Sequence, residues 1–299
     1  MTAINLMERF FAKRFSKNRF LSILELGRPW NGLAPSLTVL IGILISSSIL
    51  PSINTTALAM ISVLFCFSAG TVLNDVFDIE IDKLNMNFRP LQSKRVTYRE
   101  AVGFMLLLYI LGLGISLFLT FKFFVSIIIF TISSILYSLP PFSIEKRGFL
   151  AQIWLSIATF LIPAYAGIVL ITDNFYVPNE LLLSFVSFTL MYSFIVIIKD
   201  FKDVRGDMKG GKRTFVLSVG EKTSKGIMIT GTLIMFIITM YFLNLTINNF
   251  LFLIFSLPFI FTTLYNEIRL KNPEIAFQNI RLSAFYFLLI IILFSVLRI

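Results

Sequence analysis

Nine long apolar stretches, separated by polar segments, dominate the pattern of hydrophobic and polar positions along this chain. Each stretch approaches the length that a helix needs to cross a hydrocarbon core of roughly 30 Å. We therefore predict an all-α polytopic membrane protein with nine transmembrane helices in a single domain over residues 1–299. The predicted spans are 32–50, 56–74, 101–120, 123–140, 149–171, 181–199, 226–244, 249–266 and 282–298.

The composition agrees with a membrane protein and excludes several other classes. Of the 299 residues, 57% are apolar and 14% are charged, which is unusual for a soluble protein of this length. The lone Cys66 excludes disulfides and zinc–cysteine clusters. Because the chain has no histidine, a general base must be a carboxylate, a lysine, a tyrosine, water or the substrate.

The net charge of +10 follows the predicted topology instead of forming a nucleic-acid-binding surface. Basic residues gather after the second, fourth, sixth and eighth spans, whereas the connections 47–55, 172–180 and 245–248 carry none; Lys122 is the main exception. This asymmetry is the positive-inside pattern. We expect a multi-pass protein of the cell membrane with its N-terminus and the ends of spans two and six facing the cytoplasm. The partners then include membrane lipid and no nucleic acid.

Three polar segments border the same predicted face. Residues 1–27 mix basic and aromatic side chains at helical spacing, which fits a helix lying in the membrane interface. The connections 83–100 and 200–225 are longer than tight turns. Long connections in compact proteins often serve as lids or binding loops, so we expect these two to cap the bundle.

An acidic pattern occurs twice, each time at the end of an apolar span. The copies are NDVFDIEID at 74–82 and KDFKDVRGD at 199–207. Their aspartates coincide pairwise: Asp75 with Asp200, Asp78 with Asp203, and Asp82 with Asp207. The equal position in each half predicts a four-helix unit used twice, with a ninth helix appended and a shared site at the interface.

The duplicated aspartates point to metal chemistry. An ionisable group in a membrane segment costs about 2.5–3.5 kcal/mol on insertion scales, so such groups are candidates for function. Residues i, i+3 and i+7 share a helix face, so we expect the three aspartates of each copy to point one way. Magnesium takes one or two carboxylates plus phosphate oxygens, so two facing acidic helices fit magnesium ions holding a diphosphate. The predicted metal-binding residues are Asn74, Asp75, Asp78, Asp82, Asp200, Asp203 and Asp207.

Within that set the roles differ. We expect Asn74, Asp78, Asp203 and Asp207 to act in catalysis, whereas Asp75 and Asp200 are either ligands or supports of the ligands. Four basic side chains, Arg28, Arg89, Lys146 and Arg147, are candidates for the remaining phosphate oxygens. The same basic residues also satisfy the topology rule, so both explanations stay open.

At this point the chain resembles the UbiA superfamily of intramembrane prenyltransferases. The resemblance rests on three segments and on Arg28-Pro29 before the first span, in the family's order over nearly the whole chain. The segments are NDVFDIEIDKLN with Arg89-Pro90, YSLPPFSIEK at 137–146, and KDFKDVRGDMKGGKRT at 199–214. One departure is the Leu91-Gln92-Ser93 that stands where many members have Ile-Pro-Ser, and it affects the first cap connection.

The resemblance implies a nine-helix bundle around a central cavity, capped on the cytoplasmic side. It implies a prenyltransferase that binds a polyprenyl diphosphate through Mg²⁺ and moves the prenyl group to a lipophilic acceptor, releasing pyrophosphate. Tyr137 and Lys146 match family positions at the diphosphate, with Arg28 and Arg89 beside them.

The acceptor is the open part of the resemblance. Arg28-Pro29-Trp30-Asn31 is similar to the Arg-Pro-x-Asn of the archaeal branch that alkylates geranylgeranylglyceryl phosphate, which makes Asn31 an acceptor-binding candidate. An aromatic quinone precursor, as in 4-hydroxybenzoate polyprenyltransferases, is the other acceptor class. The alternatives are a terpene cyclase on the same fold and a non-enzymatic lipid or ion transporter.

Overall fold

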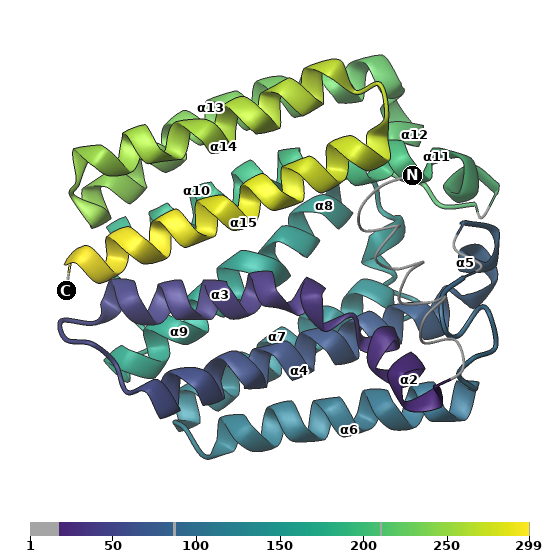
Figure 1. Ribbon diagram of the computed structural model, residues 1–299, viewed down its shortest axis with the longest axis horizontal. Helices are drawn as coiled ribbons and strands as arrows, with labels where there is room; N and C mark the ends of the chain where they lie inside the picture. The colour runs from purple at the N-terminus through teal and green to yellow at the C-terminus, as the bar shows by residue number, and fades with distance from the viewer. Residues whose placement is uncertain (1–17, 86–87, 210, 299) are drawn as a thin grey trace.

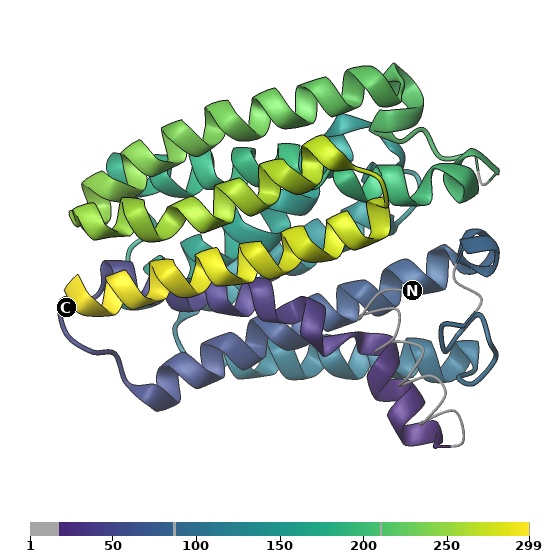
Figure 2. The ribbon, with the colours of Figure 1, turned by 45° about the horizontal axis from the view of Figure 1, so that its top comes forward.

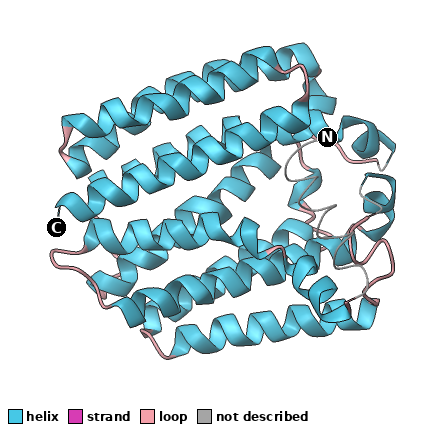
Figure 3. Cartoon of the chain, in the orientation of Figure 1, coloured by secondary structure: helices cyan, strands magenta, loops and turns pink. Residues whose placement is uncertain are grey.

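The computed structural model describes residues 18–85, 88–209 and 211–298, and this part of the chain is helical, with no β-strand (Figure 3). One short π-helical segment, η2, and one 3₁₀ turn, η1, interrupt the α-helices. The α-helices of the first half are α2 Arg19–Gly27, α3 Pro29–Ser46, α4 Ile53–Phe77, α5 Ile79–Asn85, α6 Tyr98–Leu117 and α7 Phe121–Ser138. The turn η1 covers Ile144–Lys146, and α8 Phe149–Ser156, η2 Ile157–Leu161 and α9 Ile162–Thr172 follow. The second half contains α10 Asn179–Ile195, α11 Ile198–Lys209, α12 Phe215–Val219, α13 Glu221–Ile247, α14 Phe250–Arg269 and α15 Pro273–Arg298.

Nine helical stretches within the described residues are long and apolar enough to cross a membrane. Each coincides with one predicted span, so the nine-span all-α prediction is confirmed. Some helices begin several polar residues before the predicted apolar span: α6 begins at Tyr98 and α15 at Pro273. The helix α6 begins at a capping box formed by Thr97 and Glu100. The helix α15 begins at Pro273, and the side chain of Asn272 accepts hydrogen bonds there from two backbone N–H groups.

The helices run roughly side by side in one bundle (Figure 1). The helix α3 is central, because it packs against α4, α9 and α15. On either side of it, α6 packs on α4 and α13 packs on α10. The backbones of α3 and α9 come close, because a Cβ atom on Gly42 would lie 2.2 Å from the Ala164 carbonyl oxygen. Small residues at such crossings let helix backbones come close.

The fifth span is not a single regular helix. Between α8 and α9 it widens into η2, which ends two residues before Pro163, a residue with no N–H to continue the ladder. Such π-turns re-aim side chains and frequently occur at functional sites. Here Ala158, Thr159 and Phe160 of η2 line the central cavity.

Four short helices, α2, α5, α11 and α12, gather at one end of the bundle (Figures 1 and 2). The helices α5 and α11 contact each other and thereby join the two halves of the chain. The predicted cap connections 83–100 and 200–225 therefore contain helices as well as loops. In the connection 200–225 the helical parts pack apolar side chains against the main core, with Val216 buried and Phe201 and Val204 partly buried.

Part of the N-terminal prediction falls outside the described residues, namely 1–17. The described remainder forms α2, whose first turn is capped by Asn18 and whose Leu26 is fully buried. The placement of this segment in a membrane interface stays a prediction, as does the relation of the two four-helix units.

Candidate active site

A cavity of about 620 Å³ opens between the helices near the end that carries α5 and α11. One part of its lining is polar and the other is apolar, which suits a ligand with a charged head and an apolar tail. The polar part includes Arg28, Asn31, Asn74, Asp78, Asp82, Arg89, Tyr137, Glu145, Lys199, Asp200, Lys202, Asp207, Lys212 and Arg281. The apolar part includes Phe67, Phe130, Leu155, Ala158, Phe160, Tyr192, Phe285 and Leu288.

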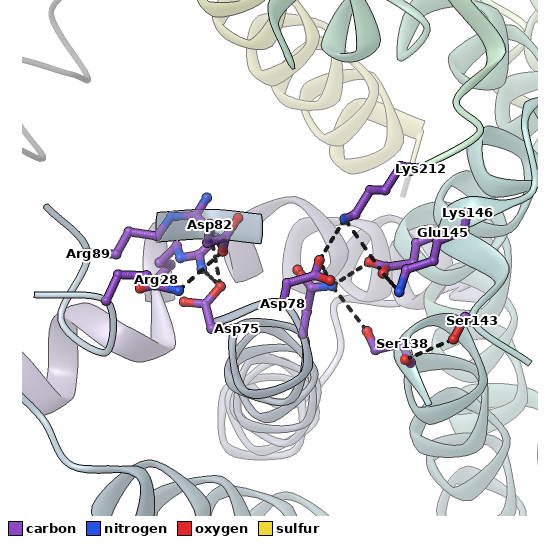
Figure 4. Close-up of polar contacts among 12 residues, drawn as sticks. Arg28, Asp75, Asp78, Asp82, Arg89, Ser138, Ser143, Glu145, Lys146 and Lys212 are labelled. Atoms are coloured by element: carbon purple, nitrogen blue, oxygen red, sulfur yellow. Dashed lines mark hydrogen bonds and ion pairs between the residues drawn. The ribbon is translucent and has the colours of Figure 1, made fainter. Parts of the chain in front are cut away.

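The three aspartates of the first acidic pattern do not point one way, which corrects the expectation of a shared helix face. The helix α4 ends at Phe77 with Asp78 as its C-cap, and α5 starts at Ile79. The break separates the carboxylates into two groups, with Asp75 and Asp82 in one and Asp78 in the other (Figure 4).

The first group is an ion-pair cluster of two acids and two arginines. Asp75 is fully buried and accepts hydrogen bonds from Arg28 and, at 3.2 Å, from Arg89. Arg89 also donates to Asp82, so one guanidinium bridges both carboxylates (Figure 4). Asp82 lines the cavity, whereas Asp75 is not among the described lining residues. This arrangement favours the supporting role for Asp75, because its arginine partners face the cavity.

The second group centres on Asp78 and joins distant segments. Lys212 Nζ donates to Asp78 Oδ2 at 2.7 Å and lies 3.6 Å from Glu145 Oε1 (Figure 4). Asn74 Nδ2 donates to Glu145 Oε2 at 2.6 Å and to Asp78 Oδ2 at 3.4 Å. A lysine that follows the second acidic pattern thus binds the central aspartate of the first.

Burial shapes the electrostatics of these groups. It raises the pKa of Glu145, although the Lys212 ammonium opposes the shift. It also raises the pKa of Asp82 against the attraction of Arg89. Burial alone would lower the pKa of Lys212, but Glu145 and Asp78 together raise it, so this ammonium keeps its charge.

The second acidic pattern contributes Asp200 and Asp207 to the cavity wall. Asp200 Oδ2 accepts from Gln152 Nε2 at 2.7 Å and from the Phe215 N–H at 3.0 Å, which anchors α11 to α8 and α12. Asp207 is buried, and its carbonyl oxygen accepts from the Lys212 N–H at 3.0 Å. The side chain of Asp203 lies outside the described residues, so its predicted role stays a prediction.

The remaining predicted residues are distributed unevenly. Arg28, Arg89, Tyr137 and Asn31 all line the cavity. Lys146 does not belong to the described lining; its side chain is 40% exposed, and its Nζ lies 3.9 Å from Glu145 Oε1. The Lys212 ammonium lies in the cavity lining and pairs there with Asp78 and Glu145.

The described acidic side chains of the cavity supply only some of the oxygen ligands that a divalent cation needs, and a bound phosphate or water must supply the rest. Among the described side chains, no three acidic or other metal-binding residues cluster closely enough to enclose an ion. However, Asp78 Oδ1 is buried and accepts no hydrogen bond from any described group, which is the condition of a carboxylate oxygen available to a cation. Because magnesium typically takes only one or two carboxylates and completes its shell with phosphate and water, such a partial site is compatible with it.

A sequence model of the UbiA prenyltransferase family matches residues 36–293. The chain belongs to the UbiA prenyltransferase family. Digeranylgeranylglyceryl phosphate synthase of Methanobrevibacter smithii is 30% identical over 263 residues, which are 84% of this chain and 87% of that protein. The enzyme of the same name from Sulfurisphaera tokodaii is 30% identical over 203 residues, covering 67% of this chain and 70% of the relative.

Solved structures of UbiA proteins share the fold. A structure described as giving insights into digeranylgeranylglyceryl phosphate synthase in membranes is 26% identical, with a TM-score of 0.69 over 93% of this chain and 99% of that one. A UbiA homologue from Archaeoglobus fulgidus, bound to GPP and Mg²⁺, has a TM-score of 0.72 at 19% identity over 92% of this chain and 99% of its own. This UbiA chain is therefore a prenyltransferase and a multi-pass membrane protein.

The cavity lining of this UbiA chain includes residues that were not among the predicted site residues, among them Glu145, Gln152, Lys212 and Arg281. Two of them carried a usable signal, because Glu145 stands inside YSLPPFSIEK and Lys212 inside KDFKDVRGDMKGGKRT. Gln152 lies within the predicted fifth span, and a polar side chain within a span is the general signal that would have found it. Arg281 lies just before the predicted ninth span, so that signal does not apply to it.

Proposed function

We propose that this UbiA enzyme is a magnesium-dependent transferase that joins a geranylgeranyl group to geranylgeranylglyceryl phosphate. The observation that carries the proposal is the meeting of Asp78, Glu145 and Lys212 at the polar end of a cavity whose other end is aromatic and aliphatic. A prenyl diphosphate has a polyanionic head and a long apolar tail. The polar part of the cavity suits the diphosphate head, and the apolar part suits the prenyl tail.

The head of the donor belongs at the acidic end. Asp78 and Asp82 from the first pattern and Asp207 from the second line this end and are the described candidates to hold Mg²⁺, together with Asn74. Bound Mg²⁺ would neutralise the charge of the departing pyrophosphate and so ease cleavage of the carbon–oxygen bond.

Basic side chains bind the phosphate oxygens that are left. Arg28 and Arg89 face the cavity and are held in place by Asp75 behind them. Lys212 lies between Asp78 and Glu145, within reach of a phosphate bound there. Charge-assisted hydrogen bonds from these three donors are stronger than neutral ones, so they orient the diphosphate.

The apolar end excludes water from the prenyl tail. Phe67, Phe130 and Phe160 line this part of the cavity, and an aromatic face attracts the positive charge that develops on the allylic carbon. In the transfer, the carbon–oxygen bond to diphosphate breaks and the acceptor hydroxyl oxygen bonds to that carbon. The hydroxyl proton passes to the released pyrophosphate or to water.

The acceptor assignment draws on the relatives and on one short segment. Several relatives of this chain are named digeranylgeranylglyceryl phosphate synthase, which fixes the product of those proteins. The segment Arg28-Pro29-Trp30-Asn31 places two cavity-lining side chains one helical turn apart. We also propose that the end with α5 and α11 faces the cytoplasm, because the basic connections lie there.

The test is pyrophosphate release by the purified protein in detergent, with geranylgeranyl diphosphate and Mg²⁺. Three reactions are compared: no acceptor, geranylgeranylglyceryl phosphate, and 4-hydroxybenzoate. We expect release only with the glyceryl phosphate, and we expect EDTA to abolish it and added Mg²⁺ to restore it.

The other results would each contradict the proposal in a specific way. Release only with 4-hydroxybenzoate would indicate a quinone-type enzyme, and release without any acceptor would indicate a terpene cyclase. Activity that survives complete chelation would remove the metal from the proposal.

A further inference from the structure

The apolar end of the cavity lies deep in the bundle, beside the π-helical segment η2. On the fifth span the described lining residues begin at Gly148 and end at Phe160. At a helical rise of about 1.5 Å per residue, this stretch is about 18 Å long. The polar end lies near its start, because Gln152 donates to Asp200 at 2.7 Å. Phe160 is therefore far from the acidic side chains.

The burial of the lining side chains shows where the cavity closes. Phe130, Phe160 and Leu288 all line the cavity, yet each is only 1% exposed, so each meets it with little more than an edge. By contrast, Leu155 lines the same wall between Gly148 and Phe160 and is only partly buried. The closed end of the cavity thus consists of three side chains, from α7, η2 and α15.

The ring of Phe160 is fixed at this closed end by its neighbours. It packs edge-on against Phe188 and Tyr192 of α10, with centroid distances of 4.8 and 4.5 Å. One turn further along the span, Ala164 is packed against the backbone of α3 at Gly42. A chain that fills the cavity therefore meets an aromatic ring that is held from α10, with close helix packing beyond it.

We propose that Phe160 sets the length of the prenyl chain that this enzyme accepts, by contacting the last isoprenyl unit of the bound tail. The inference rests on the proposed function, which places the tail at the apolar end, and it adds the residue that selects among donors. Prenyl donors differ by whole five-carbon units. A wall that fits one length leaves a void behind a shorter chain and obstructs a longer one. In a hydrophobic pocket a single methylene group already changes specificity by about 10- to 200-fold.

The decisive variant is Phe160→Ala, and its readout is the preference between donors. The substitution removes a phenyl ring, which is similar in size to one isoprenyl unit, and leaves a space at the closed end. We compare kcat/KM for geranylgeranyl diphosphate with kcat/KM for the diphosphate that is one isoprenyl unit longer. We expect the ratio to shift at least about tenfold toward the longer donor.

Phe123→Ala is the matched control for lost packing. Phe123 is fully buried on α7, as Phe160 is on η2, but it is not a described lining residue of the cavity. This variant should keep the wild-type ratio between the two donors, even if it is less stable. An equal shift in Phe123→Ala would attribute the effect to a loosened core and refute the role of Phe160.

Two further variants guard against a folding defect. Phe160→Leu keeps most of the packing and should shift the preference in the same direction as Phe160→Ala, but less. Leu288→Phe adds volume at the same closed end and should shift the preference toward farnesyl diphosphate, one unit shorter than geranylgeranyl diphosphate. Wild-type ratios in both variants would show that the closed end does not measure the chain.

A binding measurement without any acceptor separates this proposal from the proposed function. The ligands are thiolodiphosphate analogues of the three donors, in which sulfur replaces the bridging oxygen and resists cleavage. Calorimetric titration with Mg²⁺ should show that Phe160→Ala, relative to the wild type, binds the longest analogue more tightly than the others. That result without transfer to geranylgeranylglyceryl phosphate would preserve the role of Phe160 and refute the proposed acceptor. The same relative affinities in both proteins, or no binding by the wild type, would refute the role of Phe160 whatever the acceptor is.

Discussion

Lys212 Nζ lies 2.7 Å from Asp78 Oδ2, although 134 positions separate the two residues along the chain. The contact connects the segment after α11 with the end of α4. Both side chains are largely buried, and Glu145 lies on the far side of the ammonium at 3.6 Å. The lysine is therefore the positive charge that these two buried carboxylates share.

Replacing this lysine with methionine tests its role at the diphosphate. We expect Lys212→Met to lower kcat/KM for the prenyl diphosphate about tenfold to a hundredfold, because a charged hydrogen bond is worth about 1.5–3 kcal/mol. Lys212→Arg should restore part of the loss. Lys83→Met is the control, since Lys83 pairs on the surface with the 81% exposed Glu80. Steady-state kinetics of pyrophosphate release measure both, and wild-type constants for Lys212→Met would contradict the assignment.

Asp78 provides a direct test of the metal site. Asp78→Asn keeps the size of the side chain and removes the charge of an oxygen that no described group donates to. We expect the Mg²⁺ concentration for half-maximal activity to rise roughly tenfold or more, the scale on which metal-site partners act. Glu80→Gln, in the same acidic pattern but exposed, should leave the Mg²⁺ dependence unchanged. An identical Mg²⁺ requirement in both variants would exclude Asp78 as a ligand.

The connection that carries Arg89 is held by a neighbouring arginine. Arg95 donates to both Glu25 oxygens, at 2.6 and 2.9 Å, and to the Phe88 carbonyl oxygen at 2.7 Å. We expect Arg95→Met to raise the KM for the diphosphate several-fold with a smaller effect on kcat, because Arg89 loses its fixed position. Arg99→Met removes an exposed arginine from the same region and should behave as the wild type. A kcat effect without a KM effect would argue against a positioning role for Arg95.

The sequence predicted the spans well because membrane helices depend on a local property. A hydrocarbon core requires about 20 apolar residues in a row, and every one of the nine stretches satisfies this without reference to its neighbours. The ends were less predictable. The helix from Pro273 to Arg298 extends well before the predicted start at 282, since capping by Asn272 lies outside any hydropathy window.

The site was only partly predictable, because its geometry depends on tertiary contacts. The spacing of Asp75, Asp78 and Asp82 indicated one face, but the helix break at Asp78 turns them in two directions. Arg281 gave no motif signal at all, since its partner Asn31 lies 250 positions away. Hydropathy and short motifs report on neighbours in sequence, whereas these contacts are set by how α3, α4 and α15 pack.

The crossing of α3 and α9 gives a prediction for stability that is independent of the chemistry. A Cβ atom at Gly42 would lie 2.2 Å from the Ala164 carbonyl oxygen, and one at Gly167 would lie 2.3 Å from that of Val39. Both obstacles are backbone atoms, so neither can move aside without shifting a helix. The two glycines therefore set the distance between the helices, and an added methyl group must force them apart.

We expect Gly42→Ala and Gly167→Ala each to destabilise the protein by about 1–3 kcal/mol, the usual cost of overpacking. Gly103→Ala is the matched control, because a Cβ atom there meets no described atom within 4 Å and alanine favours a helix over glycine. Thermal unfolding in detergent would measure all three, with a lowered midpoint for the first two and an unchanged or raised midpoint for the third. If Gly42→Ala unfolds at the wild-type temperature, α3 and α9 do not approach as closely as this packing requires.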